Sequence, residues 1–315
     1  MSRYGLCLVI TVMLVSASGA TCAKHRTIKE FQPEVVWKEM PTIEQVMEQV
    51  NGSRRIQQLQ SSTITLKLDA PGTPALSANL SIERPRRLRL QARVSRLMGN
   101  ELDMGSNEQV FWLQTMRPQP TLFYAQHQQF EQLTARKVLP VSPDWIIEAL
   151  GLPEMNPADI HEGPIQRADG LLEVRSQIGT ALGTTRRILV LDRSGLVREI
   201  ILYDAQGNLV AQAKQTEHEN YPGVNYALPH HVQIRLLPAG EPEINFDIDV
   251  GFYLVNELMG NDPQRWTMPD PAGLSVIDLV QFAQGQQVAP IPPNYHPEWM
   301  EREAMAIPYR GFERR

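Results

Sequence analysis

Alternation of apolar and polar residues between positions 76 and 94 constrains this chain more than any other sequence feature. Apolar residues take every second position from 76 to 82 and again from 88 to 94, with a turn between the two runs. A period of two is typical of antiparallel strands with one dry and one wet face. The runs 110–113 and 122–124 are apolar throughout, which predicts strands that are covered on both faces. Together these runs predict a long, curled antiparallel sheet with another part of the chain against its inner surface.

The rest of the chain adds strands and a few helices. Thr42 and Gln45 form a capping box that predicts a helix running toward residue 59, and Ser142-Pro143-Asp144 predicts a short helix that ends before Gly151. After a predicted loop at 151–170, strand patterns separated by turn signals continue to residue 250. Such spacing, about 8–12 residues, is found in sandwiches and barrels. Residues 274–282 predict one more helix.

The N-terminus has the pattern of an export signal. Arg3 precedes an apolar run at 6–15, which is about half of the ~20 residues that a membrane-spanning helix needs. Cys22 directly follows this region, and the other cysteine, Cys7, lies within the signal. Two interpretations are open: Cys22 is the lipidated first residue of a bacterial lipoprotein, or cleavage after Ala20 leaves a free thiol.

Composition and charge place most of the chain in one exported domain. Net charge is −5 over 315 residues with no concentrated basic field, which argues against a nucleic-acid partner. We predict an export signal at 1–21, a polar tether at 22–41, one domain at 42–285, and a Pro-rich, loosely ordered tail at 286–315.

A search for catalytic and metal-binding motifs finds none. The chain has no nucleophile elbow, P-loop or dinucleotide fingerprint, and its histidines lack ligand spacing. His218 lies between Glu217 and Glu219. This triplet is either a weak candidate for a metal site or, as we expect, part of an ordinary surface loop. Asp247 and Asp249 share one face of a strand, where we expect them to be solvated. We therefore expect a protein that is not an enzyme, has no catalytic residue, and needs neither a metal nor another cofactor.

Six arginines between 84 and 96 are the most unusual local feature. One interpretation is that they keep a strand edge solvated and protect it from pairing with other chains. The other is contact with anionic headgroups or an acidic partner, where each charge contributes about 1 kcal/mol near an anionic surface.

The inner face of the sheet is almost wholly apolar, and again two arrangements are open. A curled sheet closed by helices can enclose an apolar cavity that suits acyl chains, with about 0.8 kcal/mol gained for each buried CH₂. Alternatively, the helices predicted at 42–59 and 145–150 fill the concavity completely and form an ordinary core.

In its sequence motifs and their order, the chain resembles the LolA/LolB-type lipoprotein-localisation superfamily. Ile82-Glu83-Arg84-Pro85, followed by the strand 87–90, is similar to that family's "RP-x-x-x-R" strand. Residues 104–113 resemble its "sdG-x-x-vW" hairpin, although Asn107 replaces the usual turn glycine, and residues 189–207 resemble its later hairpin pair. The order of these motifs covers residues 42–271.

The resemblance implies an α+β fold that is mainly antiparallel β. The expected architecture is a curled, unclosed β-barrel of about ten to eleven strands with helices on the concave side. It also implies a lipid-binding, chaperone-like transport role for lipid or lipoprotein acyl chains in outer-membrane lipoprotein sorting or envelope biogenesis. The location would be the periplasmic face of a bacterial membrane, the outer membrane being the expected site because Ala23 follows the anchor cysteine.

The predicted site residues are an anchor and a set of aromatic and basic side chains. Cys22 is the lipidation site, and the residues expected at the rim or lining of the ligand cavity are Arg87, Arg89, Trp112, Phe123, Tyr124 and Trp145. One alternative is an envelope-stress sensor or scaffold of the same fold that binds a partner protein through the sheet edge or the tail. The other is a hydrolase, for which no nucleophile and base are visible.

Overall fold

The computed structural model describes residues 33–69, 72–95, 99–133, 138–180, 183–257 and 262–285. All of them belong to one compact unit, Gln32–Arg315. The predicted export signal, Cys22 and the tail at 286–315 lie outside the described residues. Of the predicted tether, residues 33–41 are described, and within them Trp37 is buried in the main core.

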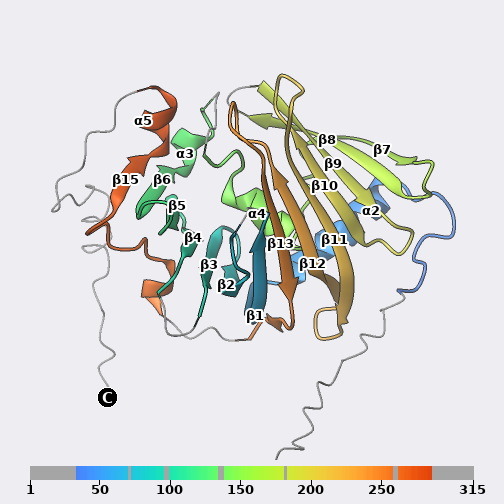
Figure 1. Ribbon diagram of the computed structural model, residues 1–315. Helices are drawn as coiled ribbons and strands as arrows, with labels where there is room; N and C mark the ends of the chain where they lie inside the picture. Colours follow the sequence, from blue (N-terminus) through green and yellow to red (C-terminus); the bar gives the residue numbers. More distant parts are fainter. Residues whose placement is uncertain are drawn as a thin grey trace, which may run out of the picture. The chain divides into compact units, whose positions relative to one another are not determined.

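One sheet organises this unit, and Figure 1 shows it as a continuous curved ladder of strands. Its order is β15-β6-β5-β4-β3-β2-β1-β13-β12-β11-β10-β9-β8-β7, with β14 paired to β1. The strands are β1 (Gln58–Leu68), β2 (Leu76–Glu83), β3 (Arg87–Arg93), β4 (Leu102–Ser106), β5 (Val110–Thr115), β6 (Thr121–Gln126), β7 (Ile160–Gln166), β8 (Leu172–Thr180), β9 (Gly183–Leu191), β10 (Val197–Tyr203), β11 (Leu209–Tyr221), β12 (Tyr226–Leu236), β13 (Ile244–Val250), β14 (Leu254–Val255) and β15 (Ser275–Asp278).

The unclosed, mainly antiparallel sheet agrees with the sequence prediction, but its strand number does not. The described residues form 15 strands, more than the ten to eleven expected. Three of the additional strands are short or irregular: β7 lies within the predicted loop 151–170, β14 has two residues, and β15 pairs in parallel with β6. None of the three has a clear period of two, so the pattern that identified the others could not identify them.

The alternation in β2 and β3 produces the two faces that it predicts. In β3, Leu88, Leu90 and Ala92 are buried, while the residues between them are only partly buried. The register pairs Leu80 with Leu90 and Ser81 with Arg89. Apolar residues of the two strands therefore lie beside each other on one face, and polar residues lie beside each other on the other face.

Few helices accompany the sheet: α2 (Ile43–Val50), α3 (His127–Phe130), α4 (Pro143–Ala149) and α5 (Leu279–Ala283), with 3-10 turns at Asn51–Arg55 and Pro263–Trp266. The predicted capping box is confirmed, because Thr42 and Gln45 exchange side-chain hydrogen bonds with each other's backbone N–H. The predicted extension of this helix to residue 59 is wrong, because α2 ends at Val50 and β1 begins at Gln58. The predicted helix at 274–282 is confirmed only in its second half, which belongs to α5, because residues 275–278 form β15. No helix in the described ranges combines the length and apolarity needed to cross a membrane.

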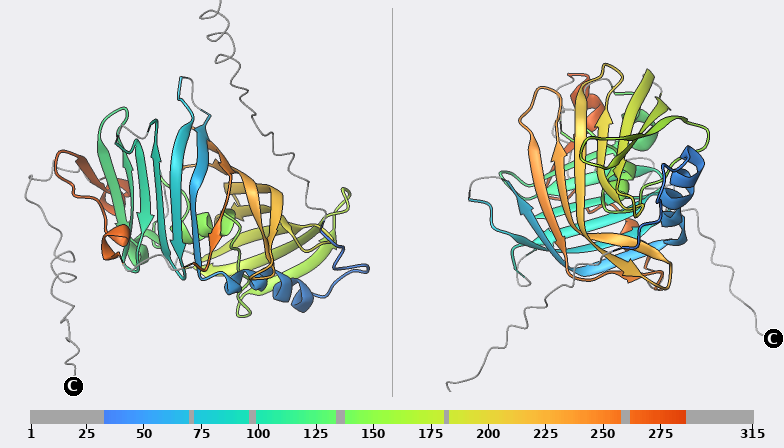
Figure 2. Two further views of the ribbon diagram at one scale, coloured as in Figure 1. Left: turned by 90° about the horizontal axis from the view of Figure 1, so that it is seen from below. Right: turned by 90° about the vertical axis from the view of Figure 1, so that its right-hand side faces the viewer.

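Helix α4 defines what we call the inner face of the sheet, the face against which it packs. Figures 1 and 2 show α4 within the curve of the strands. Trp145, Ile146 and Ile147 of this helix join the same buried cluster as Leu88 and Leu90 of β3. Val46 and Val50 of α2 belong to the cluster as well, so short helices and the apolar strand faces share one core.

The opposite face of β5 and β6 carries a second buried group, which we call the outer cluster. It consists of Val110, Trp112, Leu122, Tyr124 and Met268, with Leu274 and Val276 packed against it. Because Met268, Leu274 and Val276 come from residues 262–278, that segment covers the outer face of these strands. The prediction that 110–113 and 122–124 are covered on both faces is confirmed.

Candidate functional site

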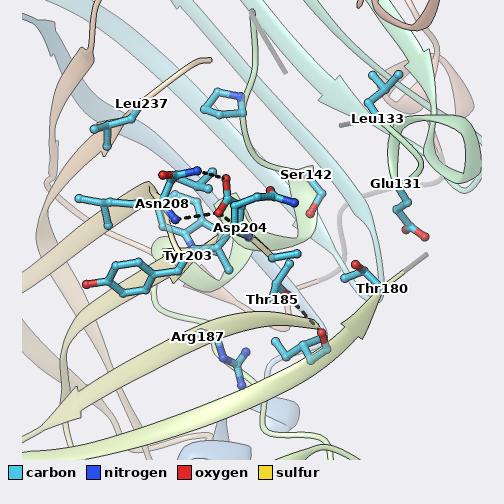
Figure 3. A pocket seen from close by; sticks show the side chains of 18 of the residues that line it. Glu131, Leu133, Ser142, Thr180, Thr185, Arg187, Tyr203, Asp204, Asn208 and Leu237 are labelled. Atoms are coloured by element: carbon cyan, nitrogen blue, oxygen red, sulfur yellow. Dashed lines mark hydrogen bonds between the residues drawn. The ribbon is translucent and has the colours of Figure 1, made fainter. Parts of the chain in front are cut away.

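A cavity of about 670 Å³ lies between α4, the strands β8 to β11 and the segment 237–239 that follows β12. Its volume falls within the range of about 300–1,000 Å³ that is usual for sites of small ligands. Figure 3 shows side chains from β8, β9 and the β10–β11 hairpin around it. The lining is mostly apolar and includes Leu133, Pro140, Trp145, Ile178, Leu202, Leu209, Val210 and Leu237.

Strand β9 brings one charged residue to the inner face beside this cavity. Leu189 and Leu191 point to the inner face and are fully buried, and the period of two puts Arg187 on the same side. Arg187 is paired across the sheet with Ser176 of β8 and Leu202 of β10. Only 3% of Arg187 is exposed, so a guanidinium is buried within an apolar surface.

Glu148 of α4 is the direct partner of this arginine. Arg187 Nη1 donates to Glu148 Oε1 at 2.6 Å. Gln215 of β11 fixes the end of the helix, because its Nε2 donates to the backbone oxygens of Ala149 at 2.9 Å and Glu148 at 3.2 Å. These bonds satisfy carbonyls that a helix C-terminus leaves without partners. Trp145 and Glu148 are three residues apart, so α4 presents both on one side.

Four polar atoms at this site are buried and have no hydrogen-bond partner among the described residues. They are Arg187 Nε, Arg187 Nη2, Glu148 Oε2 and Trp145 Nε1. A buried polar atom without a partner costs about 1–3 kcal/mol, and native proteins contain few of them. Burial also raises the pKa of the Glu148 carboxyl, an effect that the charge of Arg187 opposes. These atoms expose almost no surface, so they are buried behind the mainly apolar lining of the cavity.

The β10–β11 hairpin forms one side of the cavity. Asp204 Oδ1 accepts from the backbone N–H of Gln206 at 3.0 Å and of Asn208 at 2.8 Å. Gly207 completes the turn with φ +84°, a conformation that suits glycine. Figure 3 shows Asp204 and Asn208 joined by hydrogen bonds and well separated from Arg187. The turn predicted at 204–208 is confirmed, and its own bonds hold it in place.

Of the predicted lining residues, only Trp145 contributes to this cavity. Trp112 and Tyr124 belong to the outer cluster, and Phe123 packs against the main core. Arg89 pairs with Asp103 at 2.6 Å and lies 5.0 Å from the centre of the Trp112 ring. The strand pattern gave each side chain a face but could not show which face bordered a void.

The arginines near residue 87 form ion pairs with acidic side chains of this protein. Arg87 pairs with Glu83 at 2.7 Å and with Glu108 at 2.5 Å. Arg86 pairs with Asp144 at 2.9 Å, and Arg84 pairs with Glu154. Strand β3 lies between β2 and β4, so the interpretation as protection of a strand edge is wrong. The acidic partners that these arginines use are residues of the same chain.

Arg187 and Glu148 were missed by the sequence reasoning, although a signal for Arg187 exists. In the run 185–191, Arg187 is in phase with Leu189 and Leu191, which mark the buried face. An arginine in the apolar phase of a strand predicts a buried charge. The position of Glu148 carried no such signal, because its partner is 39 residues away in the sequence.

No group of three or more His, Cys, Asp or Glu side chains within the described ranges could hold a metal ion. His218 is not in a surface loop as expected. It lies in β11, is 6% exposed, and its Nδ1 accepts a hydrogen bond from Arg198 Nη1 at 3.3 Å. An arginine always donates, so this bond requires an unprotonated Nδ1.

This histidine predicts a loss of stability in acid. Burial, and then the charge of Arg198, lowers the pKa of His218 from 6.5 to about 4. The unprotonated His218 contributes its full share of the free energy of unfolding above the unfolded-state pKa of 6.5. As pH falls toward 4, this share is lost and the free energy of unfolding decreases by about 3 kcal/mol. His218→Gln is expected to flatten this loss in urea denaturation curves recorded across that pH window. Parallel pH profiles for the two proteins would contradict the assignment.

Comparison with known proteins finds similarity in solved structures alone. Neither a protein-family model nor a curated protein sequence matches the chain. A domain described as an outer membrane lipoprotein-sorting protein from Vibrio parahaemolyticus is 11% identical, with a TM-score of 0.49, and the match covers 71% of this chain and 97% of that one. A DUF1329 family protein from Desulfovibrio piger is 11% identical, with a TM-score of 0.47 and coverage of 71% and 95%. The chain is also similar to a LolA superfamily protein from Nitrosomonas europaea, at 11% identity, a TM-score of 0.44 and coverage of 72% and 98%.

Proposed function

We propose that this protein is a non-enzymatic, periplasmic binding protein that holds a lipid or a lipoprotein acyl group in the cavity beside α4. The observation that carries the proposal is the cavity of about 670 Å³ on the inner face, bordered mainly by apolar side chains. Each CH₂ group buried there contributes about 0.8 kcal/mol to binding. The resemblance of the sequence motifs to the LolA/LolB type implies the same class of ligand and a role in outer-membrane lipoprotein sorting or envelope biogenesis.

The test is extraction of purified protein with organic solvent, followed by mass spectrometry. We expect an acyl ligand in the extract, or uptake of an added one. Thr185→Trp is expected to abolish it, because Thr185 lines the cavity and a larger ring there fills the space. Thr184→Trp is the matched control, since Thr184 is exposed and outside the lining. If no acyl compound copurifies or is taken up, the proposal fails.

We further propose that lipid on Cys22 anchors the protein at the periplasmic face of the outer membrane. A cysteine directly after an export signal, with no second cysteine in the mature chain, supports this proposal. Cells grown with a radioactive fatty acid are expected to label the wild-type protein and to leave Cys22→Ala unlabelled. Absence of label in the wild type would leave ordinary signal cleavage as the explanation.

A second candidate is a scaffold or envelope-stress sensor that binds a partner protein through the outer edge of β7. This strand pairs with β8 on one side and ends the sheet, and Ile160 and Ile165 on it are 63% and 46% exposed. Exposed strand edges accept an added strand from another chain. Replacing both isoleucines with lysine should abolish partner capture and leave acyl binding unchanged. Deletion of 286–315 tests the tail in the same way.

A further inference from the structure

The segment before α2 carries three exposed apolar side chains within six residues. Val35, Val36 and Met40 are 54%, 53% and 47% exposed. They are three of the eight large apolar side chains that are exposed within the described ranges. Single apolar side chains scattered over a surface are normal, whereas a local group of them marks an interaction site. We call these three residues the apolar patch.

Hydrogen bonds hold the backbone of this segment against the β9–β10 turn. The N–H groups of Val36 and Trp37 donate to Arg193 O at 3.1 and 3.0 Å, and Ser194 Oγ donates to Pro33 O at 3.3 Å. The Trp37 side chain is 7% exposed and belongs to the main core. Because Trp37 is buried and the backbone beside it is bonded, the apolar patch is a fixed part of the domain surface.

The apolar patch and the mouth of the cavity lie at opposite ends of β10. The β9–β10 turn, which binds the segment of the patch, precedes Val197, the first residue of β10. The β10–β11 turn follows Tyr203, the last residue, and its exposed residues Ala205, Gln206 and Asn208 border the cavity. The seven residues of β10 separate the two turns by about 23 Å. Figure 1 accordingly shows the blue segment before α2 well apart from α4, which borders the cavity.

The proposed lipid anchor is close to the apolar patch along the chain. Pro33 follows Cys22 by eleven positions, and a chain of that length spans at most about 40 Å. Lipid on Cys22 therefore keeps the patch within reach of the membrane surface. The exposed charges beside the patch, Glu34, Lys38 and Glu39, sum to one negative charge, so attraction to anionic headgroups does not drive a contact there. Burial of the apolar side chains is the remaining driving force.

We infer that the apolar patch contacts the phospholipid surface beside the anchor, so that the mouth of the cavity at the other end of β10 faces away from the membrane. The inference rests on the proposed function, because it takes the lipid on Cys22 and the ligand cavity from it and adds the orientation of the domain. Apolar side chains at such a surface enter the boundary between headgroups and acyl chains by about 5–10 Å. An acyl ligand then reaches the cavity from the aqueous side and not directly from the bilayer.

Spin labels on introduced cysteines test the orientation, because lipidation leaves the mature chain without a free thiol. The full lipidated chain is reconstituted in vesicles of phosphatidylethanolamine and phosphatidylglycerol. A label on Val36→Cys is expected about 5–10 Å below the phosphates, shielded from a water-soluble nickel chelate. Labels on Gln206→Cys and Ile160→Cys should stay accessible to the chelate. Ile160 is the matched control, since it is 63% exposed but pairs with Gln177 near the mouth end of β8.

A second set of variants tests the apolar contact itself. Val35→Asp combined with Met40→Asp should make the label at 36 as accessible as the label at 206, whereas Ile160→Asp should leave it shielded. A shielded label at 206, or an accessible label at 36 in the parent chain, would overturn the inference and leave the anchor and the cavity standing. Shielding at 36 in Cys22→Ala without vesicles would indicate contact with a second copy instead, which also overturns it. If the chain does not associate with vesicles at all, the proposed anchor fails together with the inference.

Discussion

Gly105→Ala is expected to lower the free energy of unfolding by about 3 kcal/mol, the upper part of the range for overpacking. A Cβ at position 105 would lie 2.1 Å from Cζ2 of Trp112 and 2.4 Å from its Cε2. The ring cannot move away, because Trp112 has no exposed surface and is held between Arg89 and the outer cluster. Urea denaturation at equilibrium measures the change.

The same contact predicts strong coupling between the two residues. Trp112→Ala alone should cost about 4 kcal/mol, because it leaves a cavity in a closed cluster. The double variant should cost about as much as Trp112→Ala alone, since the added methyl group no longer meets a ring. Gly223→Ala is the control: its Cβ would meet nothing within 4 Å, so we expect a change below about 0.5 kcal/mol. Additive costs in the double variant would show that the clash is not the cause.

Arg187→Met is expected to cost about 4 kcal/mol, because removing one partner leaves a buried carboxylate without compensation. The side chains of Arg187 and Glu148 are 4% and 20% exposed. The double variant Arg187→Met/Glu148→Leu should recover most of this loss, since an apolar pair of similar volume avoids the desolvation of both charges. Thermal and urea unfolding of both variants provide the measurement.

The pH dependence of the single variant gives an independent check. The pKa of Glu148 is already raised by burial, and loss of the neighbouring guanidinium raises it further. A group whose pKa is higher in the folded state contributes full stability below its unfolded-state pKa and loses it as pH rises. The deficit of Arg187→Met should therefore grow as pH rises above the ordinary carboxyl pKa of 4.5.

An exposed ion pair on the same sheet serves as the control for this variant. Arg235 and Glu243 lie 2.5 Å apart, and their side chains are 44% and 46% exposed. Arg235→Met should cost less than about 1 kcal/mol, because solvent screens exposed pairs. Similar losses for the exposed and buried pairs would argue that burial of Arg187 has no special consequence.

Local sequence signals account for much of the fold. The period of two in 76–94 correctly assigned the dry and wet faces of β2 and β3, since this alternation is a property of the extended backbone alone. The capping box at Thr42 and the turn at 204–208 were predicted for the same reason: their hydrogen bonds join residues only a few positions apart.

Long-range pairing was beyond such signals. Strand β1 pairs with β13, and β15 pairs in parallel with β6, more than 150 residues away in the sequence. Residues 274–278 have a mixed pattern that fits either a helix or a strand, and contact with β6 decides it. Likewise, the arginines of β3 meet acidic partners whose approach no local pattern encodes.

The sequence alone determined which side chains share a face, where turns fall and that both sides of β5 and β6 are apolar. Only the tertiary structure decided that residues 262–278 seal the outer face of β5 and β6 and that a cavity beside α4 remains on the inner face. It also placed Arg187 against Glu148 in the lining of that cavity. The physical reason is that periodicity follows from the backbone of each strand, whereas an unfilled volume depends on the summed sizes and positions of side chains from many distant segments.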